Sequence, residues 1–194
     1  MVQRLTFPVF LMLSIVLVSG CGGSLFKVKP AVELPPLADS AKHADAGGVT
    51  IRVAPLLTDE ESQDLFEANL PLSGVLPVRV ELRYESGVPV ETKQARFRLR
   101  DNQSREWKLL SPKRAISRIL KANGVFAYNP YSRKQFEKEF TAYALNVKTP
   151  LSASDSAHQG FLFFQSPTNR PVESVDKLTL TVERLPQTAT IDLN

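Results

Sequence analysis

Cysteine and histidine are scarce in this chain of 194 residues, which contains one cysteine, Cys21, and two histidines. A single cysteine excludes an intrachain disulfide. Zinc is usually held by several Cys and His side chains together, so this composition argues against a metal site. No glycine-rich phosphate loop of the usual spacing is present either. We therefore expect neither a metal nor another cofactor.

A strong excess of one charge is also lacking. The formal net charge is +4, which is too small to indicate a nucleic-acid-binding protein. Hydrophobic residues make up 43% of the chain and charged residues 23%, which is typical of a chain that builds a folded core.

Long hydrophobic runs are limited to residues 5–18, and Pro8 interrupts that run. A membrane-spanning helix needs roughly 20 apolar residues, so this run is too short to span. It follows the basic residue Arg4 and precedes small residues, which is the pattern of a secretory signal peptide.

The sequence Val18-Ser19-Gly20-Cys21 follows this run and resembles the lipobox of bacterial lipoproteins, in which an aliphatic and two small residues precede an invariant cysteine. The resemblance implies that residues 1–20 are a lipoprotein signal peptide and that Cys21 is lipidated and begins the mature chain. In Gram-negative lipoproteins an aspartate at the next position favours the inner membrane. Gly22 therefore points to the outer membrane, facing the periplasm. The alternatives are a free thiol or an ordinary signal peptide with a cysteine nearby.

Residues 21–48 are predicted to form a lipidated, flexible tether. Gly22-Gly23, Pro35-Pro36 and Gly47-Gly48 interrupt any helical or strand periodicity in this stretch. Extended at roughly 3.1 Å per residue, such a tether reaches about 80 Å. The folded domain, predicted for residues 49–194, therefore need not touch the membrane.

Alternation of apolar and charged residues predicts antiparallel strands from Val49 onward. The clearest runs are residues 49–53, 78–84, 95–99 and 178–182. Further strands are expected around Trp107, in the apolar run 161–164 and near Ile191, about seven in all. This pattern predicts a mainly β fold, an immunoglobulin-like antiparallel β-sandwich. The Cys-Trp-Cys marker of true immunoglobulin domains is absent.

Three helices are expected between the strands. Thr58 and Glu61 have the spacing of a capping box and predict a short helix before Phe66. Ser111-Pro112 and Asn123-Gly124 have the residue types that begin and end a helix. A further helix is predicted from Ser132, with an apolar stripe of Phe136, Phe140, Tyr143, Ala144 and Val147. The last two helices form an insertion over about residues 111–147.

No catalytic constellation is recognisable, so we expect a protein without enzymatic activity. The sequence Asp155-Ser156-Ala157-His158 suggests a Ser/His/Asp triad, but three residues so close in one loop rarely reach the required geometry. A polar loop before a buried strand is the simpler interpretation. The alternative to a non-enzymatic protein is an envelope hydrolase, or another enzyme, whose site is scattered through the sequence.

Charge is distributed unevenly along the domain. Residues 111–140 contain seven Lys and Arg against two Glu, whereas residues 49–70 contain five acids against one Arg. The apolar face of the first inserted helix should turn its cations outward. The candidate binding residues are therefore Lys113, Arg114, Arg118 and Lys121. Their partner would be an anionic envelope component, such as lipid headgroups or lipopolysaccharide, or an envelope protein. The alternatives are a solvated helix face or internal pairing with the acidic segment.

Together these features predict a lipid-anchored, non-enzymatic binding or structural module of the bacterial cell envelope. Its N-terminal lipid would make the membrane one of its partners.

Overall fold

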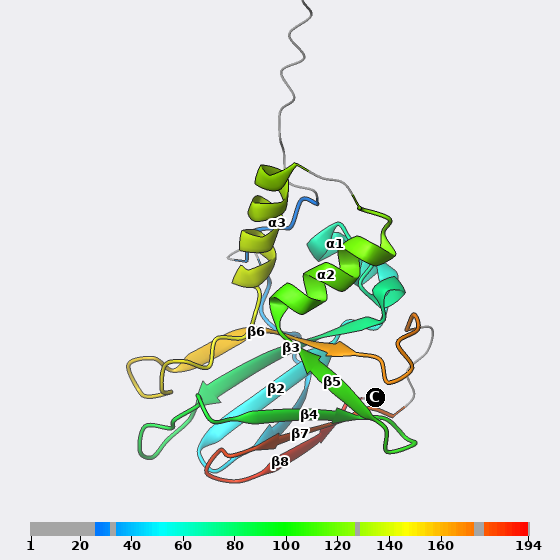
Figure 1. The fold of residues 1–194 in the computed structure, drawn as a ribbon. Helices are drawn as coiled ribbons and strands as arrows, with labels where there is room; N and C mark the ends of the chain where they lie inside the picture. The colour runs from blue at the N-terminus through cyan, green and yellow to red at the C-terminus, as the bar shows by residue number, and fades with distance from the viewer. Residues whose placement is uncertain (1–25, 32–33, 127–128, 173–176, 194) are drawn as a thin grey trace, which may run out of the picture.

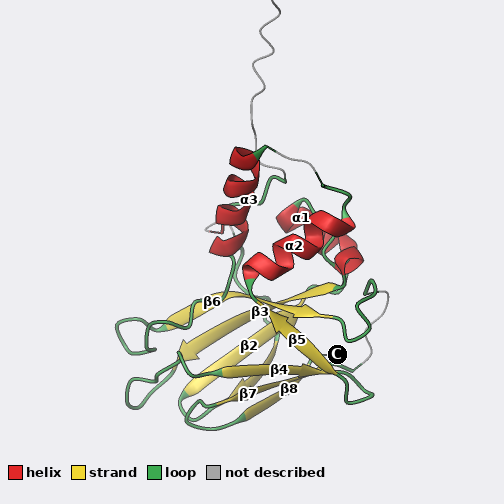
Figure 2. Cartoon of the chain, in the orientation of Figure 1, coloured by secondary structure: helices red, strands yellow, loops and turns green. Residues whose placement is uncertain are grey.

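The computed structural model describes residues 26–31, 34–126, 129–172 and 177–193. They form a mainly β fold, in which eight antiparallel strands make one strongly curved sheet and the helices form a layer on one side of it (Figures 1 and 2). Cys21 and the predicted signal peptide lie outside the described residues.

The strand order in the sheet is β1-β2-β3-β6-β5-β4-β7-β8. The edge strands β1 and β8 lie close to each other, so the sheet curls until it is nearly closed and barrel-like. The bounds are β1 Lys42–Asp45, β2 Val49–Pro55, β3 Val75–Tyr84, β4 Arg96–Arg100, β5 Glu106–Leu110, β6 Ala157–Gln165, β7 Thr179–Glu183 and β8 Ala189–Asp192.

The interior of the sheet is filled by the alternating apolar residues that the sequence displays. Ile51, Val80 and Leu180 are among those that are fully buried there. The predicted two-layer sandwich is replaced by one continuous sheet, because β5 pairs with both neighbouring strands. Leu99 of β4 lies opposite Trp107, and Leu110 lies opposite Phe163 of β6. Apolar residues alternate along the strands in the same way in a sandwich and in a barrel, so the sequence pattern does not distinguish the two folds.

The helical layer contains α1 (Asp59–Phe66), the 3-10 helix η2 (Pro71–Ser73), α2 (Pro112–Ala122) and α3 (Pro130–Ala142). The predicted capping box is confirmed, since Thr58 accepts from the backbone of Glu61 and Glu61 accepts from that of Thr58. The predicted start of the last helix at Ser132 is wrong: Asn129 caps α3, whose first residue is Pro130, and Ser132 is buried within it.

The run Phe161–Phe164 is a buried strand, as predicted, and it faces two cores. Leu162 and Phe164 belong to the interior of the sheet, whereas Phe161 and Phe163 face the helices. Phe163 stacks on Phe140 of α3 with ring centroids 4.6 Å apart. The continuous apolar run therefore reflects a strand that is covered on both sides.

After α3 the chain lies along β6 where β5 no longer pairs with it. Phe161 N donates to Tyr143 O (2.6 Å), and Leu145 N donates to Phe161 O (3.0 Å). A Cβ at Gly160 would lie 2.6 Å from Leu145 Cα. Ala144 therefore belongs to this bridge. The prediction that Ala144 and Val147 continue the helix is wrong, because α3 ends at Ala142.

The described part of the predicted tether is packed against the domain. Phe26 contacts Phe136 of α3 edge-to-face, with centroids 5.1 Å apart, and Val28 is buried in the helical core. Tyr143 Oη donates to Lys29 O (2.6 Å), and Lys29 forms an ion pair with Asp64 of α1 (2.6 Å).

Two arginines on the outer face of the sheet hold the following stretch. Arg52 Nη2 donates to the carbonyls of Leu37 (3.2 Å) and Ala38 (2.9 Å). Arg79 Nη2 donates to Pro35 O (2.5 Å), and burial lowers the pKa of its guanidinium. Strand β1 follows directly, so the folded unit extends well before the predicted boundary at Val49. Proline blocks helix and sheet here but leaves carbonyls free to accept from arginine.

Candidate functional site: a basic cavity beside α2

Helix α2 presents one apolar and one basic face, as predicted. Ala115, Ile116, Ile119 and Leu120 are buried. Of the four candidate binding residues, Lys113, Arg114 and Lys121 are exposed, and Arg118 is half-buried.

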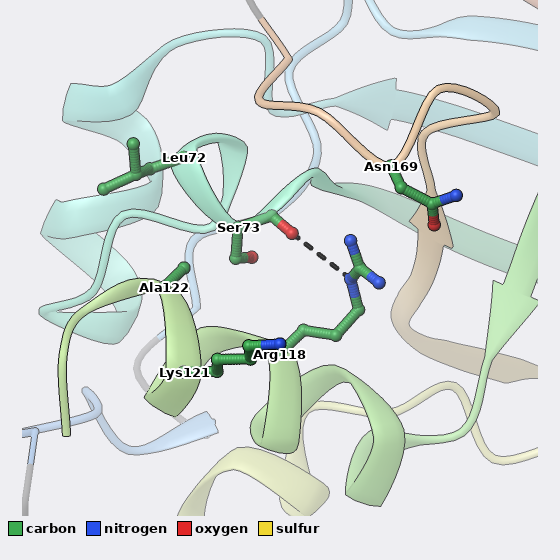
Figure 3. A pocket seen from close by; sticks show the side chains of 6 residues that line it. All are labelled: Leu72, Ser73, Arg118, Lys121, Ala122 and Asn169. Atoms are coloured by element: carbon green, nitrogen blue, oxygen red, sulfur yellow. Dashed lines mark hydrogen bonds between the residues drawn. The ribbon is translucent and has the colours of Figure 1, made fainter. Parts of the chain in front are cut away.

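The structure brings Arg118 and Lys121 together in one cavity of about 460 Å³ between α2, η2 and the β6–β7 loop (Figure 3). Lys113 and Arg114 do not line it. The described residues that line it are Leu72, Ser73, Arg118, Lys121, Ala122 and Asn169.

Arg118 is held by a backbone contact, since its Nε donates to Ser73 O (3.2 Å). Figure 3 shows the guanidinium extending from α2 towards Asn169. A guanidinium has five N–H donors in a planar fork, so one bond to Ser73 leaves donors for another acceptor.

Gly74 and a turn in the β6–β7 loop lie beside this cavity. Gly74 has φ 70°, and a Cβ there would lie 2.7 Å from Arg170 O and 3.4 Å from Arg118 Nη2. Ser166 accepts from Asn169 N through its carbonyl (3.0 Å), and Asn169 has φ 58°. Both positions use the left-handed backbone conformation, which glycine and asparagine tolerate best.

No carboxylate of the described residues lines the cavity, and three acids in and next to α1 contact other groups. Glu61 closes the capping box, Asp64 pairs with Lys29, and Glu67 accepts from Lys27 N (2.5 Å). Within the described residues no ion pair joins the cations of α2 to this acidic segment. Internal pairing of the two charged segments is therefore not what the structure shows.

Chemically, the cavity offers hydrogen-bond donors and positive charge. Two cationic side chains and the amide of Asn169 suit an oxyanion such as a phosphate or carboxylate. Sequence reasoning found Arg118 and Lys121 but missed Ser73 and Asn169. These two lie on elements far from α2 in the sequence, and no local motif connects them.

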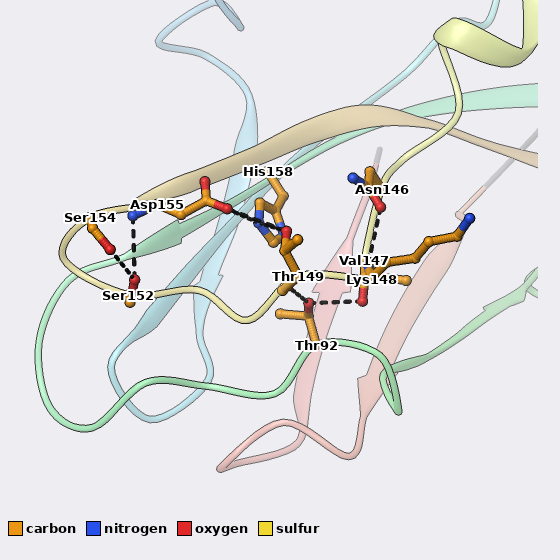
Figure 4. Close-up of polar contacts among 9 residues, drawn as sticks. All are labelled: Thr92, Asn146, Val147, Lys148, Thr149, Ser152, Ser154, Asp155 and His158. Carbon is orange, nitrogen blue, oxygen red and sulfur yellow. Dashed lines mark hydrogen bonds and ion pairs between the residues drawn. The ribbon is translucent and has the colours of Figure 1, made fainter.

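A second polar cluster surrounds His158 at the start of β6 (Figure 4). Its Nε2 lies 3.1 Å from Thr149 Oγ1 and 3.2 Å from Asp155 Oδ2. Its Nδ1 is buried and has no hydrogen-bond partner among the described residues.

This geometry differs from that of a catalytic triad, in which the two ring nitrogens contact the acid and the nucleophile separately. Here one nitrogen contacts both neighbours. Ser156 uses its backbone carbonyl to accept from Tyr84 N (2.8 Å). Across the described residues no hydrogen bond joins its hydroxyl to His158. The cluster instead ties the β3–β4 loop down, because Thr92 Oγ1 lies 2.8 Å from Thr149 O.

In the part of the chain that the structure describes, no group of three or more His, Cys, Asp and Glu side chains could hold a metal ion. None of the described helices is long and apolar enough to cross a membrane. No protein-family model, curated protein or solved structure matches this chain.

Proposed function

We propose that the protein is a lipid-anchored, non-enzymatic binding or structural module of a bacterial cell envelope, whose basic cavity beside α2 holds an oxyanion of an envelope component. The resemblance of Val18-Ser19-Gly20-Cys21 to a lipobox supports the anchor. Gly22 favours the outer membrane, with the domain facing the periplasm.

The environment of Arg118 is the observation that supports a binding role. Arg118 is half-buried, its Nε donates to Ser73 O, and no carboxylate of the described residues lines the cavity that its side chain enters. Removing a charge from water is costly unless a counter-charge compensates for it. An anionic partner would supply that compensation, and fixed donors would bind it with little loss of side-chain entropy.

The anchor is tested by mass spectrometry of the protein purified from bacterial membranes. We expect a mature chain that begins at Cys21 and carries acyl groups. Cys21→Ala should leave the chain unprocessed or soluble. An intact Met1, or cleavage elsewhere without lipid, would rule the anchor out.

The cavity is tested by a photo-crosslinking amino acid placed at Ala122 in living cells, followed by identification of the attached molecule. Ala122 lines the cavity and is exposed, whereas Lys113 on the same helix lies outside the lining and serves as the control position.

We expect an adduct with a phosphate- or carboxylate-bearing lipid, glycan or protein from position 122, and much less from position 113. Arg118→Gln should reduce the adduct, and Arg114→Gln, which changes a cation outside the cavity, should not. Equal adducts from both positions, unaffected by Arg118→Gln, would mean that this helix face is only solvated.

A further inference from the structure

We propose that the α2–α3 end of the helical layer rests on the membrane, with Phe126 and Tyr131 entering the interface of an anionic bilayer. This inference rests on the proposed anchor at Cys21 and adds an orientation to it. The surface is called here the aromatic end, and it consists of Lys121, Phe126, Tyr131 and Lys134.

The first observation is the exposure of two large aromatic side chains. Phe126 and Tyr131 are each 79% exposed, although most aromatic residues of the described chain are buried. Phe126 lies in the loop after α2, and Tyr131 lies in the first turn of α3. The start of α3 lies at the end of the helical layer farthest from the sheet (Figure 1). Aromatic side chains at such positions are typical of membrane–water interfaces.

The second observation is charge. The sequence from Lys121 to Phe136 contains Lys121, Arg133 and Lys134 and no Asp or Glu. Lys121 and Lys134 are exposed. Cations beside interfacial aromatics are attracted to anionic lipid headgroups, so the charge of this end complements a bacterial membrane.

The third observation is how little chain separates the lipid from this end. Because Phe26 and Val28 are packed on the domain, only five peptide links join Cys21 to a residue that contacts α3. Five residues span roughly 17 Å when fully extended. The free part of the tether is therefore much shorter than the sequence led us to expect. The anchor must enter the membrane close to α3.

The same helix connects the anchor point to the aromatic end. Phe26 contacts Phe136, and Tyr131 lies five residues earlier in α3, which is about 7.5 Å along the helix axis. A lipid on Cys21, within roughly 17 Å of Phe26, thus keeps the first turn of α3 close to the bilayer surface. The lipid holds the protein at the membrane, and a weak interfacial patch beside it then binds the bilayer at high local concentration.

The test uses the full lipidated protein in vesicles of phosphatidylethanolamine and phosphatidylglycerol that contain brominated lipid. Phe126→Trp places a fluorophore in the aromatic end. Val88→Trp is the matched control, because Val88 is 78% exposed and its β3–β4 loop lies on the sheet side of the molecule, away from the helical layer (Figure 1). The single native tryptophan, Trp107, gives the same background in both variants.

We expect the added emission of Phe126→Trp to shift to the blue and to lose most of its intensity to brominated lipid, while Val88→Trp stays unchanged. Lys121→Gln with Lys134→Gln should weaken the quenching at position 126.

Three results would overturn the proposal. Acylated protein in which both added tryptophans behave alike would refute the orientation and leave the anchor standing. A blue shift without quenching would mean that a second copy, not lipid, covers Phe126. If the mass spectrum shows no acyl group on Cys21, the anchor itself fails and the orientation falls with it.

Discussion

Gly74 illustrates how one residue can position the groups beside the basic cavity. Its φ of 70° lets the chain turn from η2 into β3, and its missing side chain leaves room for Arg170 O and for the guanidinium of Arg118. Gly124 has almost the same φ, 69°, but a Cβ there would meet nothing within 4 Å. A side chain at Gly124 would therefore cause backbone strain alone, whereas a side chain at Gly74 would cause both backbone strain and steric crowding.

Gly74→Ala should destabilise the protein more than Gly124→Ala does. Both alanines enter the left-handed region, which costs roughly 1–2 kcal/mol, but only the first collides with a carbonyl oxygen. Overpacking of this kind typically adds about 1–3 kcal/mol. Urea denaturation of the two variants measures the difference. Equal losses of stability would show that the β6–β7 loop yields to the added methyl group without cost.

At the scale of elements, the contact between α3 and β6 joins the two cores. Phe66 of α1 lies among Phe140, Phe161 and Phe163, with ring centroids 5.2 to 6.2 Å apart. Since β6 also fills the interior of the sheet through Leu162 and Phe164, the helical layer and the sheet share one strand.

Phe163→Ala should lower the free energy of unfolding by about 3–5 kcal/mol, the usual cost of emptying a buried aromatic site. Phe126→Ala is the matched control, because the same substitution at an exposed position should cost less than about 0.5 kcal/mol. Denaturant melts followed by circular dichroism measure both. A loss below about 1 kcal/mol at Phe163 would contradict its burial.

The elements that could be predicted from sequence are those with a local cause. The capping box of Thr58 and the Pro112 start of α2 depend on neighbouring residues only, and both were predicted. The sheet closure was not, because it depends on which strands β5 pairs with, and no property of Trp107 reveals its partner. The residues of the site follow the same rule. Arg118 and Lys121 could be predicted together because they share a helix, whereas Asn169 comes close to them only in the tertiary fold.

For the whole molecule, the decisive feature is the N-terminal segment packed on the outer face of the sheet. Arg52 and Arg79 hold its backbone carbonyls, and Phe26 and Val28 lie against the helical layer. A stretch rich in proline was expected to be free, since its composition favours neither helix nor strand. Its contacts are made by partners elsewhere in the chain, which composition does not show.

Arg52→Met should release this segment without unfolding the sheet. The change removes the bonds to Leu37 O and Ala38 O, and Glu81 keeps Arg83 as a partner (2.7 Å). We expect thermolysin to cut within residues 34–41 much faster than in the native protein, which mass spectrometry of the fragments would show. Arg98→Met, which breaks only a surface pair with Glu183, should leave cleavage unchanged. Identical digestion of native protein and Arg52→Met would mean that other contacts hold the segment.

The neighbouring positions of β1 and β8 have a consequence for how the chain reaches its final state. These strands come from opposite ends of the described sequence and lie side by side, and β3 ends at Tyr84 while its partner β6 begins only at Ala157. A chain that emerges N-terminus first, from a ribosome or from an export channel, therefore holds β3 with one unpaired edge until β6 has emerged. Pairings this distant in sequence make folding slow, and unpaired apolar edges invite aggregation in the meantime. We therefore expect the unfinished chain to be prone to aggregation until β6 covers this edge.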